Sequence, residues 1–266
     1  MIKQIKFTKM VASGNDFIII DQRHRTYVLR PQSLALEICS RKYGAGADGL
    51  LILEKSKKAD IMVRIFNPDG SEPKMCGNGI RCVALYAHKN KINIQTKAGI
   101  INAKVNKTKV KVKMSESKHI KLDLPIKINK QNLKVNFINT GVPHVVIFVE
   151  GLNKINVINI GRQVRFHKRF SPEGTNVDFV QIQDDNNIKL RTYERGVEDE
   201  TLACGTGAVA SALLSAIRYP LSAIRKINVH TKSGEVLKVE FNRIDNKFKD
   251  VWLEGSARIV YEGIYN

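Results

Sequence analysis

Two short runs place a cysteine beside two glycines: Cys-Gly-Asn-Gly at residues 76–79 and Cys-Gly-Thr-Gly at residues 204–207. Each run precedes small or apolar residues at helical spacing, which predicts a cysteine at the N-terminus of a buried helix. Free backbone N–H groups in the first helical turn bind anions such as carboxylates, and glycines let a ligand come close. The same partial positive charge lowers the pKa of a thiol. The pattern therefore predicts two reactive thiols, each beside a carboxylate-binding site.

The cysteine runs belong to a longer internal repeat. Asn-Asp-Phe-Ile at residues 15–18 matches Asn-Val-Asp-Phe at 176–179 with one insertion, and Thr-Lys-Ala-Gly at 96–99 matches Thr-Lys-Ser-Gly at 231–234. Three matches in the same order indicate a duplicated unit. Two halves packed about a pseudo-twofold axis would place the two sulfurs on opposite faces of one carbon. One thiolate could then remove a proton while the other thiol donates one, which inverts a stereocentre without metal, pyridoxal or nicotinamide.

The elements that must position these thiols are short. Brief apolar runs alternate with Gly, Asn and Asp turn signals, which predicts mainly antiparallel strands. Residues 32–41 have helical spacing, and the segment near residues 115–135 is polar and irregular, as expected of a domain boundary. With 266 residues, 43% of them hydrophobic, the chain can bury one large core or two smaller ones.

Composition and motifs argue against several classes of protein. The four cysteines form no C-x-x-C pair and the six histidines are scattered, which argues against a zinc site. The glycine-rich loop at residues 44–49 lacks both the phosphate-loop ending and the full G-x-G-x-x-G pattern of dinucleotide-binding proteins. No apolar run is long enough for a membrane span and the N-terminus lacks the features of a signal peptide, so we expect a cytoplasmic protein.

The formal net charge of +19 leaves nucleic acid as an alternative partner. The lysines are spread along the chain among Asn and Ile residues, with no zinc finger, no RNP-type aromatic stretch and no basic arm. A biased genome composition would produce such a chain as well, so we expect no nucleic-acid partner.

Taken alone, several noteworthy residues have a purely structural explanation. Asn15 lies in a turn that its amide could cap, and His144 stands at a turn before an apolar strand. Cys39 and Cys82 lie on predicted helices, where a free cysteine is most simply a small buried hydrophobic residue.

Four motifs resemble those of diaminopimelate epimerases: Asn-x-Asp-Gly-Ser-Glu-x-x-Met-Cys-Gly-Asn-Gly-x-Arg-Cys at residues 67–82, Gly-Thr-Asn-Val-Asp-Phe at 174–179, Tyr-Glu-Arg-Gly at 193–196 and Ala-Cys-Gly-Thr-Gly at 203–207. The resemblance covers essentially the whole chain. It implies a cofactor-independent isomerase that interconverts LL- and meso-2,6-diaminopimelate for lysine and peptidoglycan precursor synthesis. It also implies a homodimer with an α+β fold of two similar pseudo-symmetric halves, each a mainly antiparallel curved sheet or barrel around a central helix. Because the last strand returns to the first half in the family, we expect halves of 1–118 plus about 255–266, and 119–254.

The resemblance also implies roles for individual residues. It makes Cys76 and Cys204 the catalytic acid/base pair, and it puts His144 and Glu194 in a position to adjust the pKa of a thiol. The distal end of the substrate would be recognised by polar side chains: Asn15, Asn67, Asn176, Glu194 and Arg195. The reacting carboxylate would be held at the two helix starts: Gly77, Asn78, Gly205 and Thr206. No metal or other cofactor is implied. The chain departs from some family members at Gly49 and Val142, which leaves part of the distal contact network open.

Other functions remain open at this point. Within enzymes, they are a two-thiol racemase of proline, hydroxyproline or histidine, and an isomerase whose substrate is not an amino acid. A basic nucleic-acid-binding protein is the alternative from another class, and it would tolerate loss of both cysteines. The Glu194-Arg195 pair and the three asparagines favour a substrate with a second polar amino-acid end.

Overall fold

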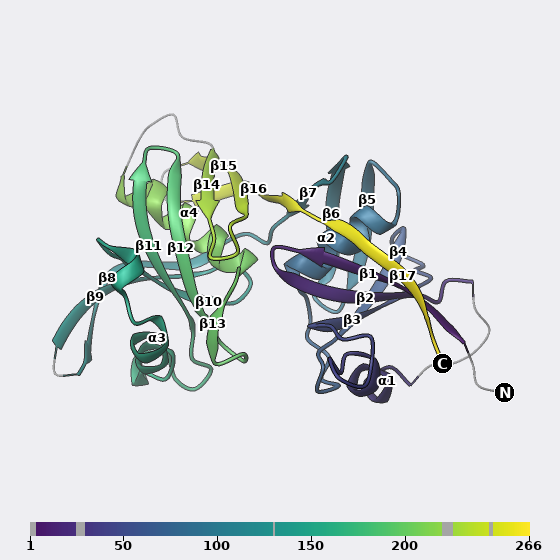
Figure 1. Ribbon diagram of the computed structural model, residues 1–266. Helices are drawn as coiled ribbons and strands as arrows, with labels where there is room; N and C mark the ends of the chain where they lie inside the picture. The colour runs from purple at the N-terminus through teal and green to yellow at the C-terminus, as the bar shows by residue number, and fades with distance from the viewer. Residues whose placement is uncertain (1–3, 25–29, 130, 220–225, 245–246) are drawn as a thin grey trace. The chain divides into compact units, whose positions relative to one another are not determined.

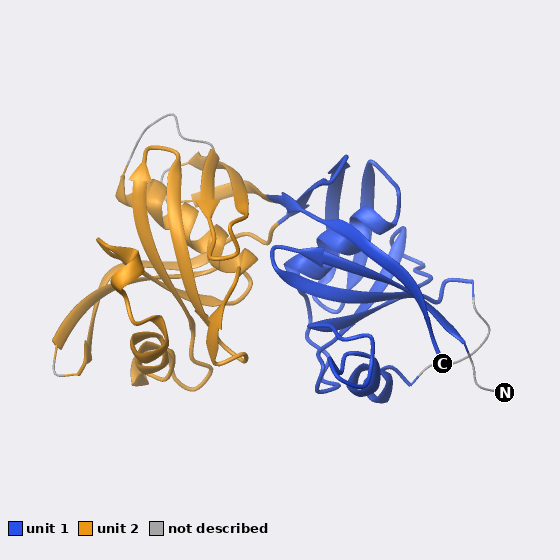
Figure 2. Ribbon diagram, viewed as in Figure 1, with its two compact units in different colours: residues 1–113, 254–266 blue, residues 114–253 orange. Residues whose placement is uncertain are grey.

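The chain folds into two units, each of which combines a mixed sheet with α-helices (Figure 1). The computed structural model describes residues 4–24, 30–129, 131–219, 226–244 and 247–266. Unit 1 comprises residues 1–113 and 254–266, and unit 2 comprises residues 114–253 (Figure 2). The C-terminal segment therefore returns to the unit that contains the N-terminal strands.

Unit 1 contains β1 (Ile5–Ala12), β2 (Asn15–Asp21), α1 (Pro31–Ile38), β3 (Gly49–Glu54), β4 (Ile61–Phe66), α2 (Gly77–Tyr86), β5 (Lys91–Thr96), β6 (Gly99–Asn106), β7 (Lys109–Lys113) and β17 (Arg258–Tyr265). Neighbouring strands lie in the order β17-β1-β2-β3-β4-β5-β6-β7. The β2–β3 and β4–β5 pairs are parallel, and the other pairs in this order are antiparallel. Helix α2 contacts strands at both ends of the order, β17 and β7 included, so the sheet curves around it.

Unit 2 contains β8 (Lys118–Ile128), β9 (Gln131–Asn139), β10 (Pro143–Phe148), α3 (Val157–Arg165), β11 (Asn176–Asp184), β12 (Asn187–Glu194), β13 (Asp199–Thr201), α4 (Gly205–Arg218), β14 (Lys226–His230), β15 (Val236–Ile244) and β16 (Lys247–Ser256), the last residues of which belong to unit 1. Short 3₁₀ turns lie at Leu152–Lys154 and Lys168–Phe170. The strand order is β8-β9-β10-β11-β12-β14-β15, with β10–β11 and β12–β14 parallel. Helix α4 contacts β9 to β12, β14 and β15.

The two sheets therefore repeat one pattern of pairing. From β1–β2 to β5–β6, and again from β9–β10 to β14–β15, antiparallel and parallel pairs alternate. In each unit a helix packed on the outer face follows the second strand of this series, and the buried helix follows the fourth. The predicted α+β fold of two similar, mainly antiparallel halves around central helices is confirmed.

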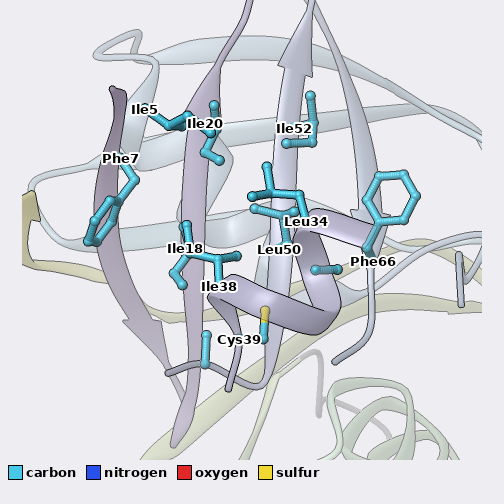
Figure 3. Close-up of a cluster of buried hydrophobic side chains, with 12 residues drawn as sticks. Ile5, Phe7, Ile18, Ile20, Leu34, Ile38, Cys39, Leu50, Ile52 and Phe66 are labelled. Carbon is cyan, nitrogen blue, oxygen red and sulfur yellow. The ribbon is translucent and has the colours of Figure 1, made fainter. Parts of the chain in front are cut away.

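Strands β2 and β3 contain uninterrupted apolar runs, at residues 17–20 and 50–53, because helices pack against both faces of the sheet. The buried side chains of α1 and those of the sheet face that it covers form a single cluster (Figure 3): Ile5, Phe7, Ile18, Ile20, Leu34, Ile38, Cys39, Leu50, Ile52 and Phe66 among them. Leu51 points to the opposite face and lies next to Gly79 of α2. Strands buried on both sides do not alternate between apolar and polar residues, which explains the sequence pattern.

Cys39 and Cys82 are confirmed as buried residues, with 2% and 0% of their surface exposed. Burial raises the pKa of Cys39 to about 11, so its thiol stays protonated at neutral pH. Within the described residues, no helix is both long and apolar enough to cross a membrane.

The segment near residues 115–135 is not irregular. It forms the hairpin of β8 and β9, whose register shifts between Lys118 and Lys121 and again between Lys121 and Leu124. His119 and Asp123 adopt positive φ at these shifts. Bulges of this kind break the period-two alternation by which a strand is recognised, so the polar pattern was misinterpreted.

One of the three predicted matches of the repeat is also wrong. Asn15 opens β2, the first strand of a parallel pair, whereas Asn176 opens β11, the second strand of the equivalent pair. An asparagine suits the turn before either strand, so the two short sequences are similar although their positions in the fold are not equivalent. The other two matches hold, because the cysteines precede α2 and α4 and the Thr-Lys-x-Gly runs join β5 to β6 and β14 to β15.

Candidate active site

Both cysteines lie where their helices begin. Cys76 is the N-terminal cap of α2 and Cys204 is that of α4, each with an extended backbone. Their carbonyl oxygens accept the first helical hydrogen bonds, from the N–H groups of Ile80 and Ala208, both at 2.9 Å. The predicted place of each thiol at a helix N-terminus is confirmed. The first helical turn leaves backbone N–H groups available to a ligand.

The glycines after the cysteines have different reasons to be there. A Cβ at Gly79 would lie 3.2 Å from Leu51, and a Cβ at Gly207 would collide with the carboxylate of Asp178. Close packing therefore excludes a Cβ at Gly207 and leaves little room for one at Gly79, the glycines at the third place after each cysteine. A Cβ at Gly77 would meet no described atom within 4 Å beyond its own chain neighbours. Packing does not need this glycine, and the helix start there is open to a ligand.

In unit 1, a chain of polar side chains leads to the first turn of α2. Arg81 is fully buried and donates to Oδ1 of Asn78 at 2.8 Å and to Ser13 at 2.6 Å. The Asn78 amide donates to Oδ1 of Asn15, whose own amide donates to Asp48 at 3.2 Å. The structure thus brings the predicted site residues Asn15 and Asn78 into direct contact.

Asn67 follows β4 and lies in the turn that precedes the first cysteine. It is exposed, and its amide donates to the hydroxyl of Ser71 at 2.9 Å. Its backbone N–H donates to the carbonyl oxygen of Ser71, also at 2.9 Å, which closes the turn. The described contacts of Asn67 are therefore local.

In unit 2, a buried chain of hydrogen bonds leads to the second thiol. Nδ1 of His144 lies 2.7 Å from the carboxylate of Asp178, and Nε2 lies 3.0 Å from the hydroxyl of Thr206. That hydroxyl is 3.5 Å from the sulfur of Cys204. Thr192 donates to the other oxygen of Asp178 at 2.7 Å. His144 therefore reaches Cys204 through a threonine hydroxyl, and the fully buried Asp178 fixes its ring.

The remaining predicted residues of unit 2 lie at the start of β11, at the end of β12 and at the start of α4. Asn176 is buried, its amide donates to the carbonyl of Pro143 at 3.0 Å, and its oxygen accepts from the backbone N–H of Arg195 at 2.8 Å. The Arg195 guanidinium donates to the carbonyl of Glu173 at 3.2 Å. Gly205 is the first residue of α4. Asn176 thus ties the strand that holds His144 to the turn after Glu194.

The electrostatics at Cys204 contradict the expectation of a lowered thiol pKa. Burial raises the pKa of Cys204 well above its ordinary range, and the negative charges of Glu194 and Asp178 raise it further. Hydrogen bonds from Thr206 and from the backbone of Gly207 lower the pKa but do not compensate. Burial likewise raises the pKa of Glu194. For this thiol the prediction is wrong, because the helix start is enclosed beside two carboxyl groups.

The two helix starts lie in the same arrangement of strands but have different side chains around them. The residue next to the third-place glycine is apolar Leu51 in unit 1 and charged Asp178 in unit 2. Gly49 lies two residues before Leu51 and pairs with Phe17 of the neighbouring parallel strand. Asn176 lies two residues before Asp178 and pairs with His144 in the same way. The carboxylate–imidazole pair therefore exists on one side of the duplicated frame only.

The same registers relate Gly49 and Val142 to two of the predicted site residues. Gly49 pairs with Phe17, and Asn176 pairs with His144, so Gly49 holds the place of Asn176. Val142, two residues before His144, holds the place that Asn15 has before Phe17. Each unit therefore has an asparagine at one of these two positions: Asn15 in unit 1 and Asn176 in unit 2.

Sequence reasoning missed Asp178 and Arg81, although both lay inside motifs that it used. A charged residue within an apolar strand or helix needs a buried partner, and this was the available signal. Asp178 interrupts Val177 and Phe179, and Arg81 follows Ile80. Across the described ranges, no group of three or more His, Cys, Asp or Glu side chains is arranged to hold a metal ion.

Comparison with known proteins shows similarity along the full length of the chain. The family described as diaminopimelate epimerase matches residues 7–120 and 136–260. The diaminopimelate epimerase of Aquifex aeolicus is 42% identical over 97% of both chains. That of Methanocella arvoryzae is 41% identical over 98% of this chain and 96% of its own.

Solved structures share the fold at much lower identity. A phenazine biosynthesis protein of the PhzF family from Bacillus anthracis superposes with a TM-score of 0.75 at 19% identity, covering 100% of both chains. A hydroxyproline epimerase from Agrobacterium vitis gives 0.72 at 14% identity, over 98% of this chain and 91% of its own. These likenesses concern the fold alone, whereas the relatives near 40% identity match over 97–98% of this chain. The chain belongs to the diaminopimelate epimerase family.

Proposed function

We propose that this chain is a cofactor-independent epimerase of 2,6-diaminopimelate in which Cys76 and Cys204 are the acid/base pair. The supporting observation is the repeated placement of a cysteine at the cap of a buried helix, once in each unit. One such cysteine could be an accident of packing. Two in a duplicated frame supply the two groups that an inversion of configuration needs.

The reaction requires no redox change. One cysteine, as thiolate, removes the α-proton of LL-diaminopimelate, and the electron pair of the C–H bond remains on the α-carbon. The other cysteine, as thiol, delivers its proton to the opposite face, which gives the meso isomer and leaves the second sulfur as thiolate. The reverse reaction exchanges the two roles, so each sulfur must serve as both acid and base.

The carbanion-like transition state is stabilised by the groups that hold its carboxylate. These are the residues of the two first helical turns: Gly77, Asn78, Gly205 and Thr206. Their N–H dipoles are fixed before the reaction, and a desolvated site strengthens their effect. The distal end of the substrate is held by polar side chains: Asn15, Asn67, Asn176, Glu194 and Arg195. Arg195 suits the distal carboxylate because its planar guanidinium can donate two parallel hydrogen bonds.

His144 and Glu194 adjust the protonation of Cys204. The chain from His144 through Thr206 to the sulfur, at 3.0 and 3.5 Å, offers a path by which a proton can move between imidazole and thiol. Asp178 contacts the other ring nitrogen and fixes the orientation of the imidazole toward Thr206.

The biological setting belongs to the same proposal. We place the enzyme in lysine biosynthesis, in the cytoplasm, as a homodimer without a nucleic-acid partner. Sedimentation tests the dimer. DNA binding that falls steeply with added salt would contradict the expectation that the protein has no nucleic-acid partner.

Solvent exchange tests the proposed reaction. The reduced protein is incubated with LL-diaminopimelate in deuterated water, and α-deuterium and the meso isomer are followed by mass spectrometry and chiral chromatography. We expect deuterium at the inverted carbon of the product. Proline, hydroxyproline and histidine serve as comparison substrates. A folded, reduced sample that exchanges none of these hydrogens would refute the proposal, and preferential exchange of one of the comparison amino acids would replace the substrate.

A further inference from the structure

A glutamate lies four residues before each cysteine and is bound in the same way in both units. In unit 1, Arg64 of β4 donates to both carboxylate oxygens of Glu72, at 2.9 and 3.0 Å. Lys97 completes the cluster, with its Nζ atom 2.7 Å from Glu72. In this geometry two positive groups from separate elements converge on one carboxylate.

Unit 2 contains the same cluster. Arg191 of β12 donates to both oxygens of Glu200 at 2.7 and 2.9 Å, and Nζ of Lys232 lies 2.9 Å away. The elements also correspond, since β4 and β12 each precede a cysteine helix. Lys97 and Lys232 occupy the same place in the two Thr-Lys-x-Gly turns. The cluster is therefore part of the duplicated frame.

Both glutamates are enclosed, with 11% of the Glu72 side chain and 6% of the Glu200 side chain exposed. The hydrogen bonds of Arg64 lower the pKa of Glu72 to about 2. At Glu200 burial opposes the change, but the bonds from Arg191 and Lys232 lower its pKa as well. Each carboxylate therefore stays ionised and attached to its arginine at neutral pH.

The chain between each glutamate and its cysteine lies outside the regular elements, and in unit 2 the N–H of Ser233 donates to the carbonyl oxygen of Leu202 at 2.9 Å, which ties this loop to the turn that carries Lys232. Residues 73–76 belong to no helix or strand, and neither do residues 202–204 after β13 ends. The cysteine backbone is consequently fixed on one side by its helix and on the other side by the bound glutamate. A charge-assisted pair of hydrogen bonds restrains direction as well as distance.

We propose that Glu72 and Glu200 are positioning residues: each holds the loop that sets its cysteine at the start of the central helix. The catalytic consequence rests on the proposed function, whereas the effect on each thiol does not. Displacement of a reacting group by about 1 Å can cost about 10²-fold in rate, so a loosened loop should affect turnover more than binding.

The test measures each thiol separately. Glu72→Gln, Glu200→Gln, Lys97→Met and Lys232→Met are compared with the wild-type protein and with Asp60→Asn. Asp60→Asn is the control because it removes an ion pair of similar length, to Lys89 at 2.6 Å, away from either cysteine loop. Iodoacetamide alkylation of the native protein is followed against pH, with Cys76 and Cys204 peptides quantified by mass spectrometry. Values of kcat and KM are measured in parallel.

We expect the unit 1 variants to change the alkylation profile of Cys76 by about threefold or more and to leave that of Cys204 unchanged. The unit 2 variants should do the reverse. A through-space charge effect would move the profile in opposite directions for the Glu→Gln and Lys→Met variants, whereas a loosened loop moves it in the same direction for both. In the active enzyme, kcat should fall about 10- to 10²-fold with a smaller change in KM.

Equal changes at both cysteines would show a general loss of structure and overturn the proposal, as would unchanged profiles in all four variants. Opposite shifts for the Glu→Gln and Lys→Met variants would also overturn it, because they would assign the effect to charge. A wild-type protein without epimerase activity would contradict the proposed function only, since the alkylation profiles would still report on the loops. Lys97 is half exposed, so Lys97→Met keeps the experiment informative if a glutamine variant fails to fold.

Discussion

The two cysteines occupy equivalent positions but have unequal surroundings. Cys204 is buried beside Glu194 and Asp178, whereas Cys76 is partly exposed and follows a loop in a unit where apolar Leu51 takes the place of Asp178. A duplicated frame can thus give one thiol that favours the protonated form. The difference between the surroundings of the two thiols comes from the neighbouring side chains, since the fold around each cysteine is the same.

Replacing either cysteine of the proposed acid/base pair should abolish most of the activity. We expect Cys76→Ala and Cys204→Ala each to lower turnover at least about 10²- to 10⁴-fold, because each removes a positioned acid or base. The measurement is the rate of meso-diaminopimelate formation. Cys39→Ala is the matched control, since Cys39 is buried in the α1 cluster, and its activity should stay near that of the wild type. A mild loss in either cysteine variant of the pair would argue against two-base catalysis.

Glu194→Gln should lower the pKa of the Cys204 thiol. The charge of Glu194 is one of the causes that raise the pKa of this thiol, because a nearby negative charge disfavours the thiolate. Removing that charge therefore shifts the pH midpoint of Cys204 alkylation downward, while the midpoint of Cys76 stays in place. An upward or absent shift at Cys204 would mean that the charge of Glu194 does not control this thiol.

Gly77→Ala and Gly207→Ala should separate binding from packing. A methyl group at Gly77 meets no described neighbour, and alanine favours a helix, so the melting temperature should not fall. The same group would stand where we expect the substrate carboxylate, so KM should rise or kcat fall. At Gly207 the methyl group collides with Asp178, and the melting temperature should drop. Thermal unfolding together with steady-state kinetics checks both, and a destabilised Gly77→Ala protein with normal kinetics would reverse our assignment.

At the level of elements, the sequence predicted helices and strands correctly where a single physical rule determined the local structure. The turn glycines and helical spacing located α2 and α4 together with their cysteines. Strand β8 and the first half of β9 were missed because the bulges at Lys121 disrupt the alternation of side chains. His144 could be identified only through the family resemblance. Its partner Asp178 comes from a parallel strand, and contacts across a sheet depend on a register that local patterns do not contain.

The Arg–Glu–Lys clusters should also contribute to stability, with a characteristic dependence on pH. The pKa of Glu72 is lowered to about 2 in the folded protein and is near 4.3 in an unfolded chain. Its contribution, on the order of 1–3 kcal/mol, is therefore present above about pH 5 and is lost as the pH falls towards 2. Glu72→Gln should unfold more easily than the wild type at pH 7, and the difference should vanish near pH 2. Urea unfolding at several pH values measures this, and a gap that stays constant down to pH 2 would exclude the ionised carboxylate as its source.

At the scale of the whole molecule, the two units share one arrangement of strands and helices but carry different side chains on it. The order of parallel and antiparallel pairs is the same in both units, while the side chains on it differ: Phe17 against His144, Leu51 against Asp178, Gly49 against Asn176. Proteins that are 14–19% identical share the frame. The duplicated arrangement therefore supplies one cysteine at a helix start in each unit, and the substituted positions give the two thiols different surroundings.

The proposed reaction requires the two sulfurs to approach one α-carbon from opposite sides, and oxidation tests this requirement. Without substrate, mild oxidation with hydrogen peroxide should join Cys76 to Cys204, since two thiols and one peroxide give a disulfide and two waters. A disulfide forms only when the two Cα atoms can come within about 7 Å, so the bond would report that the units bring the cysteines together. Activity should be lost with formation of the linked peptide and return with a dithiol, and bound substrate should slow both changes. Cys39→Ala should behave like the wild type, because Cys39 is buried in the α1 cluster. Separate oxidation of Cys76 and Cys204 without a linked peptide would count against facing thiols, and full activity after complete linkage would refute their catalytic role.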